Sequence, residues 1–159
     1  MRRQAVVGNE SLGQLAGVGV QKKRMFTTGA HRSRRFSGAA AGHELSTLLH
    51  THITLAVALL KDVKSGNATA LATDKASWYD NANQIADFLS AANPRFWPDA
   101  TMREAMKEHL DQTLAEAVDE LSGNYPASVN DYEAIHLHIL ALADLLSSGI
   151  MSQFPNRFA

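Results

Sequence analysis

The chain has 159 residues, of which 45% are apolar and 19% are charged, the composition of a single soluble globular domain with its own core. It contains no cysteine, which excludes disulfides, thiolate zinc sites and cysteine nucleophiles. The net charge of −1 hides two different segments, because residues 1–42 carry eight basic residues and one acidic residue, whereas residues 43–159 carry seven and fifteen.

Residues 1–42 form a basic arm with frequent glycine, basic clusters in "QKKR" and "HRSRR", and no sustained helical or strand period. We expect the arm to be disordered, because it has too little apolar surface to offset the entropy of ordering. Polar residues at 9–11 and at 14 interrupt the apolar core that a secretory signal needs. The compartment is unknown from the sequence, and the cytoplasm is taken only as the default. An organelle transit peptide fits the arginine-rich composition, but no amphipathic stripe accompanies it. The clusters lack interleaved aromatic residues, so no specific nucleic-acid binding is expected.

From residue 43 onward, apolar residues recur with the period of an α-helix. They predict four helices, over about residues 44–64, 69–92, 101–121 and 128–151. Two prolines in "NPRFWPD" separate the second helix from the third, and the aromatic "RFWP" is expected to close one end of the structure. Thr101 and Glu104 have the spacing of a capping box. No uninterrupted apolar run approaches the roughly 18 residues that cross a bilayer, so no transmembrane segment is predicted.

The pattern D-x-x-S-G-N-x-x-A-x-x-x-D occurs twice, beginning at Asp62 and at Asp119. Gly66 and Gly123 within it can adopt the left-handed conformation that ends a helix. We therefore predict an all-α domain over residues 43–159, an antiparallel up-down four-helix bundle built from two repeated helical hairpins. Hairpin 1 covers about residues 44–92 and hairpin 2 about residues 101–151, and the disordered basic N-terminal arm precedes them.

The candidate site is a polar layer inside this bundle. His52 aligns with His109 in the repeat and Asn81 aligns with His138, and counting from the turns places all four at nearly one level. Trp78 lies one turn from Asn81 on the same stripe. Three hypotheses follow: His52, His109 and His138 hold a divalent metal; the layer with Trp78 binds a small polar ligand; or its polar groups satisfy one another.

Other site chemistry finds little support in the residues. Glu133 and His136 have the Glu-x-x-His spacing of a di-iron site, but their counterparts Ala76 and Tyr79 do not complete it. Phosphate-binding glycine loops and the nucleophile elbow are absent from the sequence, and no catalytic residue can be named. We therefore expect a non-enzymatic module that binds a small ligand or a partner, with a metal-dependent or histidine-based enzyme as the alternative.

Several stretches, in this order, resemble a family of uncharacterised bacterial all-helical proteins: "LLHTHI", "SWYDNANQIADFL", "KEHLDQ" and "GIMSQFP". The resemblance covers about residues 36–158. Some family members are labelled glycosyltransferase or acetylglutamate kinase, but both activities need nucleotide-binding α/β folds, and no such strands are predicted here.

The resemblance also implies a further helical hairpin upstream, where residues 1–35 depart from the family pattern. We interpret these residues as a wrong-frame or misassigned start. Without that hairpin an apolar flank stays uncovered, and the resemblance then implies a homodimer or a partner helix on this flank.

Overall fold

The computed structural model describes residues 38–158. The predicted disorder of the basic arm concerns residues that lie outside this range, except for the last few residues of the arm. Four long helices follow in chain order: α2 (Ala39–Ser65), α3 (Ala68–Ala92), α4 (Asp99–Ser122) and α5 (Tyr125–Gln153), with a short 3-10 turn η1 (Pro155–Arg157) after them. The described part contains no strand, which confirms the all-α prediction with four helices. The predicted boundary at residue 42 is wrong, because α2 begins at Ala39.

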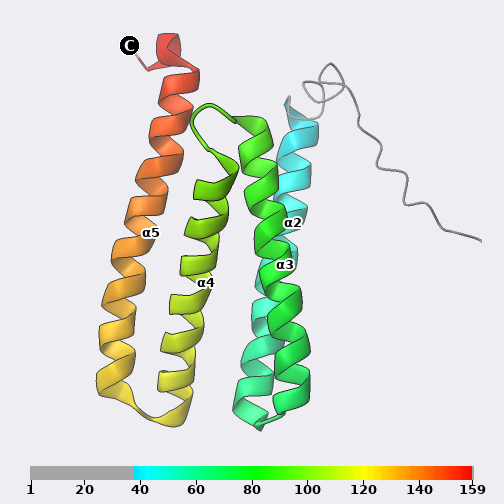
Figure 1. Ribbon diagram of the computed structural model, residues 1–159, viewed down its shortest axis with the longest axis vertical. Coiled ribbons are helices and arrows are strands. Elements are labelled where there is room, and N and C mark those ends of the chain that lie inside the picture. The colour runs from blue at the N-terminus through cyan, green and yellow to red at the C-terminus, as the bar shows by residue number, and fades with distance from the viewer. Residues whose placement is uncertain (1–37, 159) are drawn as a thin grey trace, which may run out of the picture.

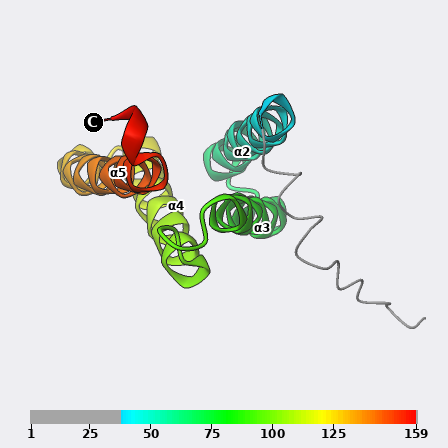
Figure 2. The ribbon, with the colours of Figure 1, turned by 90° about the horizontal axis from the view of Figure 1, so that it is seen from above.

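Each helix packs mainly against its neighbours in sequence. α2 packs on α3, α3 on α4 and α4 on α5, whereas α2 and α4 touch only slightly. Seen from above, α3 and α4 lie in the middle, and α2 and α5 lie at the two ends of an arc (Figure 2). Both short turns, after α2 and after α4, lie at the same end of the molecule (Figure 1). The helices therefore form an open array, and the first helix does not close onto the last.

The core lies between the middle helices. α3 contributes six buried residues, α2 only one and α5 two. The largest fully buried side chains are Trp78, Leu59, Met102 and Leu110. At the edge of the α3–α4 interface, the Tyr79 hydroxyl donates a hydrogen bond to Asp111, and Arg103 forms a salt bridge with Asp87.

The two short turns have the same structure. Gly66 and Gly123 have φ of 70° and 79° and end their helices in the left-handed conformation. The next residue donates its backbone N–H to the Asp62 carbonyl in the first turn and to the Asp119 carbonyl in the second. A glycine is needed at both corners, because a side chain at such a φ would be strained.

A pair of carboxyl groups accompanies each turn. Withdrawal from water and the neighbouring Asp74 raise the pKa of Asp62, and withdrawal from water and the neighbouring Asp119 raise the pKa of Asp131. Since position 62 aligns with 119 and position 74 with 131, the same like-charge contact occurs in both hairpins.

The starts of two further helices also differ from the prediction. α4 begins at Asp99 directly after Pro98, which has no side-chain capping bond, so Thr101 lies inside the helix and the predicted capping box is wrong. α5 begins at Tyr125 instead of about residue 128, because Pro126 is tolerated in a first turn whose N–H groups need no helical partner.

The loop between α3 and α4 closes one end, as predicted for "RFWP". Trp97 is buried, and its indole Nε1 donates to the Leu145 carbonyl of α5 at 3.2 Å. Asn93, also buried, donates to the Gly149 carbonyl at 3.0 Å. Gly149 is required there, because a Cβ at this position would lie 2.6 Å from Trp97 Cε2.

Candidate functional site

The layer predicted from the sequence is present, with one member from each of the four helices. The His52 Nδ1 lies 2.9 Å from the Asn81 Oδ1, and the Asn81 Nδ2 donates to the Leu48 carbonyl at 3.3 Å. Asn81 is only 3% exposed, and both of its bonds reach α2. Because its Oδ1 can only accept, the His52 Nδ1 carries the proton of this bond.

The second hairpin repeats part of this arrangement. The His138 Nε2 donates to the Ala105 carbonyl at 3.0 Å, and position 138 aligns with 81 as position 105 aligns with 48. An imidazole in one hairpin and an amide in the other thus make the same bond to the preceding helix. The His138 Nδ1 also lies 3.5 Å from Glu108 Oε2.

The three imidazoles lie in a row that crosses from α2 over α4 to α5. The ring centroids of His52 and His109 are 6.4 Å apart, and those of His109 and His138 are 6.2 Å apart. Trp78 adjoins the row, with its ring centroid 5.4 Å from that of His52. The row crosses from the first hairpin to the second, in addition to the polar contacts at the edge of the α3–α4 interface.

Two buried polar atoms in the layer have no hydrogen-bond partner among the described residues. They are the Nε1 of Trp78 and the Nδ1 of His109. Buried polar groups are nearly always satisfied by protein or by an ordered small molecule such as water. These two atoms are therefore the hydrogen-bonding groups of the layer that a small polar ligand could satisfy.

The rings do not converge as metal ligands do. They stack side by side with interplanar angles of 26° and 11°, whereas ligands of one zinc ion all point at a common centre about 2 Å away. Within residues 38–158, no group of three His, Asp or Glu side chains could hold a metal ion. The geometry gives the metal hypothesis for His52, His109 and His138 no support.

Burial lowers the pKa of both His52 and His109, and the neighbouring His52 and His138 lower that of His109 further. The hydrogen bond with Asn81 partly opposes this shift at His52. Both imidazoles are therefore neutral in the folded protein at physiological pH.

We expect the free energy of unfolding to fall as the pH drops from 7.5 to 5.5. Between the lowered pKa values of the folded state and the ordinary value near 6.5, the unfolded chain binds more protons, so protons favour unfolding. Urea denaturation at several pH values measures this effect. The His109→Gln variant should show a weaker pH dependence, and an unchanged one would contradict the assignment.

A second feature is a groove beside the turns. It has a volume of about 420 Å³, and its walls are formed by Val57 and Leu60 of α2 and by Ala117 and Leu121 of α4. Its basic rim carries Lys61 and Lys64 and its acidic rim carries Glu116 and Glu120.

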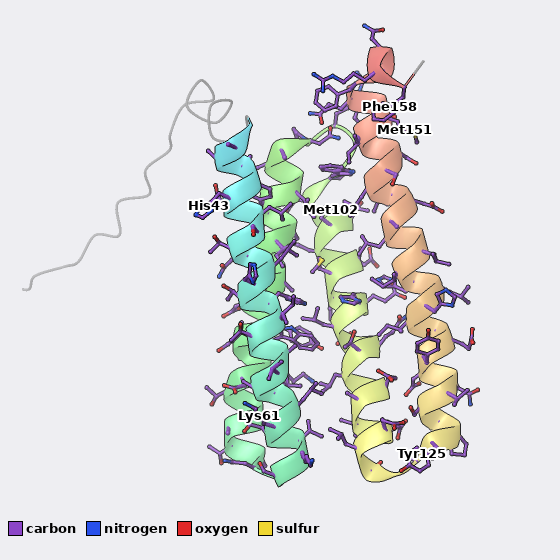
Figure 3. All side chains as sticks on the ribbon, turned by 180° about the vertical axis from the view of Figure 1, so that it is seen from behind. His43, Lys61, Met102, Tyr125, Met151 and Phe158 are labelled. Atoms are coloured by element: carbon purple, nitrogen blue, oxygen red, sulfur yellow. The ribbon has the colours of Figure 1, made fainter. Side chains whose placement is uncertain are left out.

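The groove continues into an exposed apolar surface that we call the α2–α5 face. Figure 3 looks onto this side, with α2 and α5 in front and α4 behind them. On both α2 and α5, a stripe of exposed apolar side chains lies about 100° around the helix axis from the buried residues. Because α2 and α5 are right-handed and run in opposite directions, and their buried sides face the middle helices (Figure 2), both stripes lie on this side of the molecule. The stripes contain Leu49, Ile53, Val57 and Leu60 on α2 and Tyr125, Val129, Tyr132, Ile139, Ile150 and Phe154 on α5.

α5 as a whole is unusually apolar for an exposed helix. By length and composition alone it could cross a membrane, and only 6% of its most apolar window is buried. The prediction of no transmembrane segment was based on uninterrupted runs of apolar residues. It missed this helix because His136, His138 and Asp144 interrupt the apolar run of α5, although the mean hydropathy of the helix stays high. The sequence thus carried a signal for the exposed face that the run-length criterion did not detect.

The chain matches no known family model, and neither a curated protein nor a solved structure is similar to it. The resemblance to the bacterial all-helical family stays a prediction that rests on the quoted stretches.

Proposed function

We propose that the protein is a non-enzymatic helical interaction module that binds a partner polypeptide through the α2–α5 face. The observation that carries this proposal is the position of the two apolar stripes on one side of an open helical array. Soluble domains rarely leave contiguous apolar patches of this kind uncovered, and larger ones mark interaction sites. Helices with apolar residues at i, i+3, i+4 and i+7 are the usual occupants of such grooves.

We further propose that the two hairpins arose as copies of one helical pair. The common geometry of the Gly66 and Gly123 corners supports this, as do the equivalent bonds from Asn81 and His138 to the preceding helix. Duplication explains the exposed stripes, because each copy keeps one apolar flank that the other copy does not cover.

Site-specific photo-crosslinking in the native host tests the proposed binding. A photoreactive amino acid at Val129, 62% exposed on the α2–α5 face, should give crosslinks to a polypeptide identifiable by mass spectrometry. The matched control is Asn83, exposed on α3 in a hollow lined by residues of α3 and α4. Only lipid adducts at Val129, or equal polypeptide adducts at both positions, would contradict the proposal.

The small-ligand and histidine-enzyme hypotheses both stay predictions. The unpaired Trp78 Nε1 and His109 Nδ1 support the first, and no contact of the described residues adds support to the second.

A further inference from the structure

We propose that the row formed by His52, His109 and His138 is a pH-sensitive latch, which holds α2 close to α4 in neutral solution and releases it when the row gains protons. Release means that α2 moves away from α4 while both hairpins stay folded. The inference goes beyond the proposed function, because it concerns the polar layer and does not depend on what binds the α2–α5 face.

The first argument is the place where the row crosses the molecule. His52 belongs to α2 and His109 to α4, two helices that touch only slightly, and the centroids of the two rings are 6.4 Å apart. The extensive interfaces of these helices lie elsewhere, because α2 packs on α3, and α4 packs on α3 and α5. A change in the contact between the two rings therefore acts directly on the seam between α2 and α4.

The second argument is the set of groups that face the two rings at this seam. The titratable groups beside His109 are His52 from α2 and His138 from α5. The helix α3 faces the row with Trp78 and Asn81, which do not titrate. No carboxylate among the described residues raises the pKa of His52 or of His109. A proton on either ring therefore adds a positive charge that no neighbouring carboxylate offsets.

The third ring of the row differs in this respect. The carboxylate of Glu108 on α4 lies beside His138, with Oε2 at 3.5 Å from Nδ1, and the His138 Nε2 keeps its bond to the Ala105 carbonyl. A proton on His138 thus has an acceptor within the second hairpin. The effect of protons on the latch therefore comes from the other two rings, which face each other across the seam.

The direction of the effect follows from the burial of these rings. Burial lowers the pKa of His52 and of His109, and moving α2 away from α4 admits water and returns both pKa values toward the ordinary value near 6.5. Between the lowered and the ordinary values the open form binds more protons than the closed form, so a falling pH favours the open form. Repulsion between two charged rings acts in the same direction.

Protonation leaves the first hairpin closed. The His52 Nδ1 carries a proton in the neutral ring and in the charged ring, so its bond to the Asn81 Oδ1 persists. The Asn81 Nδ2 likewise keeps its bond to the Leu48 carbonyl of α2. Since both bonds join α2 to α3, α2 stays on α3 while the seam toward α4 opens.

Double electron–electron resonance on the full chain measures the width of this seam. The chain contains no cysteine, so spin labels attach only at introduced ones, Lys61→Cys on α2 and Glu116→Cys on α4, which line the same groove. From pH 7.5 to pH 5.0 the distance between the labels should lengthen by about 3 Å or more, the diameter of the water molecules that must enter the seam. The distance should shorten again when the pH returns to 7.5.

Three controls accompany this measurement. A label pair within the second hairpin, Glu116→Cys with Glu133→Cys, should keep its distance, and circular dichroism should show unchanged helicity. Combining His52→Gln with His109→Gln should abolish the lengthening, because neither side of the seam then binds a proton, while a glutamine at 52 can still donate to Asn81. The change His50→Gln, at an exposed histidine of α2 outside the row, should leave the lengthening intact.

A constant distance between the labels at 61 and 116 in a helical protein would overturn the proposal. Equal lengthening in the double glutamine variant would overturn it as well, because the row would then not control the seam. If both label pairs lengthened together with loss of helicity, acid would unfold the whole chain, and no latch would exist. All three results leave the proposed function standing, because crosslinking from the α2–α5 face tests it separately.

Discussion

Gly149→Ala should destabilise the protein by about 2 to 4 kcal/mol. The added Cβ would lie 2.6 Å from Trp97 Cε2 and 2.9 Å from Trp97 Cδ1. An indole is rigid, so the whole ring must move, and its hydrogen bond to the Leu145 carbonyl is then lost. Thermal unfolding followed by circular dichroism measures the loss, which corresponds to several degrees in the midpoint for a domain of this size.

The matched control is the same substitution in α2. Gly42→Ala meets no atom within 4 Å, and an alanine inside a helix is favoured over glycine by about 0.5 to 1 kcal/mol. The two variants should therefore shift stability in opposite directions. A neutral Gly149→Ala would show that Trp97 does not pack against α5 as described.

Asn81→Ala should cost about 2 to 3 kcal/mol, because it removes two hydrogen bonds and leaves the His52 Nδ1 proton without its acceptor. Both bonds join α3 to α2 inside the layer, at 2.9 Å to His52 and 3.3 Å to the Leu48 carbonyl. Urea denaturation gives the difference in free energy, and the slope of the transition shows whether the unfolding stays cooperative.

Asn83→Ala is the control for this prediction, since the same residue type lies on the same helix but is exposed. Surface substitutions of this kind usually stay within about 0.5 kcal/mol. If the two variants had the same stability, the hydrogen bonds of Asn81 would contribute nothing and the layer would not hold the first hairpin together.

The helical class, the number of helices and the two glycine corners could be predicted, because helical period and turn chemistry are local properties. The proximity of His52 to Asn81 and of His109 to His138 could also be predicted. In two antiparallel helices joined by a short turn, the number of residues between each residue and the turn gives its height along the helix axis. Trp97 as an end plug followed from the two prolines that flank its segment.

The open side could not be predicted from the residues in the same way. Leu49 and Ile53 have the same apolar character as Leu48 and Leu59, and the sequence does not say which of two adjacent stripes finds a partner within the chain. Only Leu59 among these four is buried.

The order in which the helices pack has a kinetic consequence. Since every extensive interface joins elements that are consecutive along the chain, few native contacts require distant segments to find one another. Proteins dominated by such near-neighbour contacts pay little loop-closure entropy before their contacts form, and they fold in microseconds to milliseconds. A chain of this kind can complete each helical pair soon after it leaves the ribosome, before the next pair has been made.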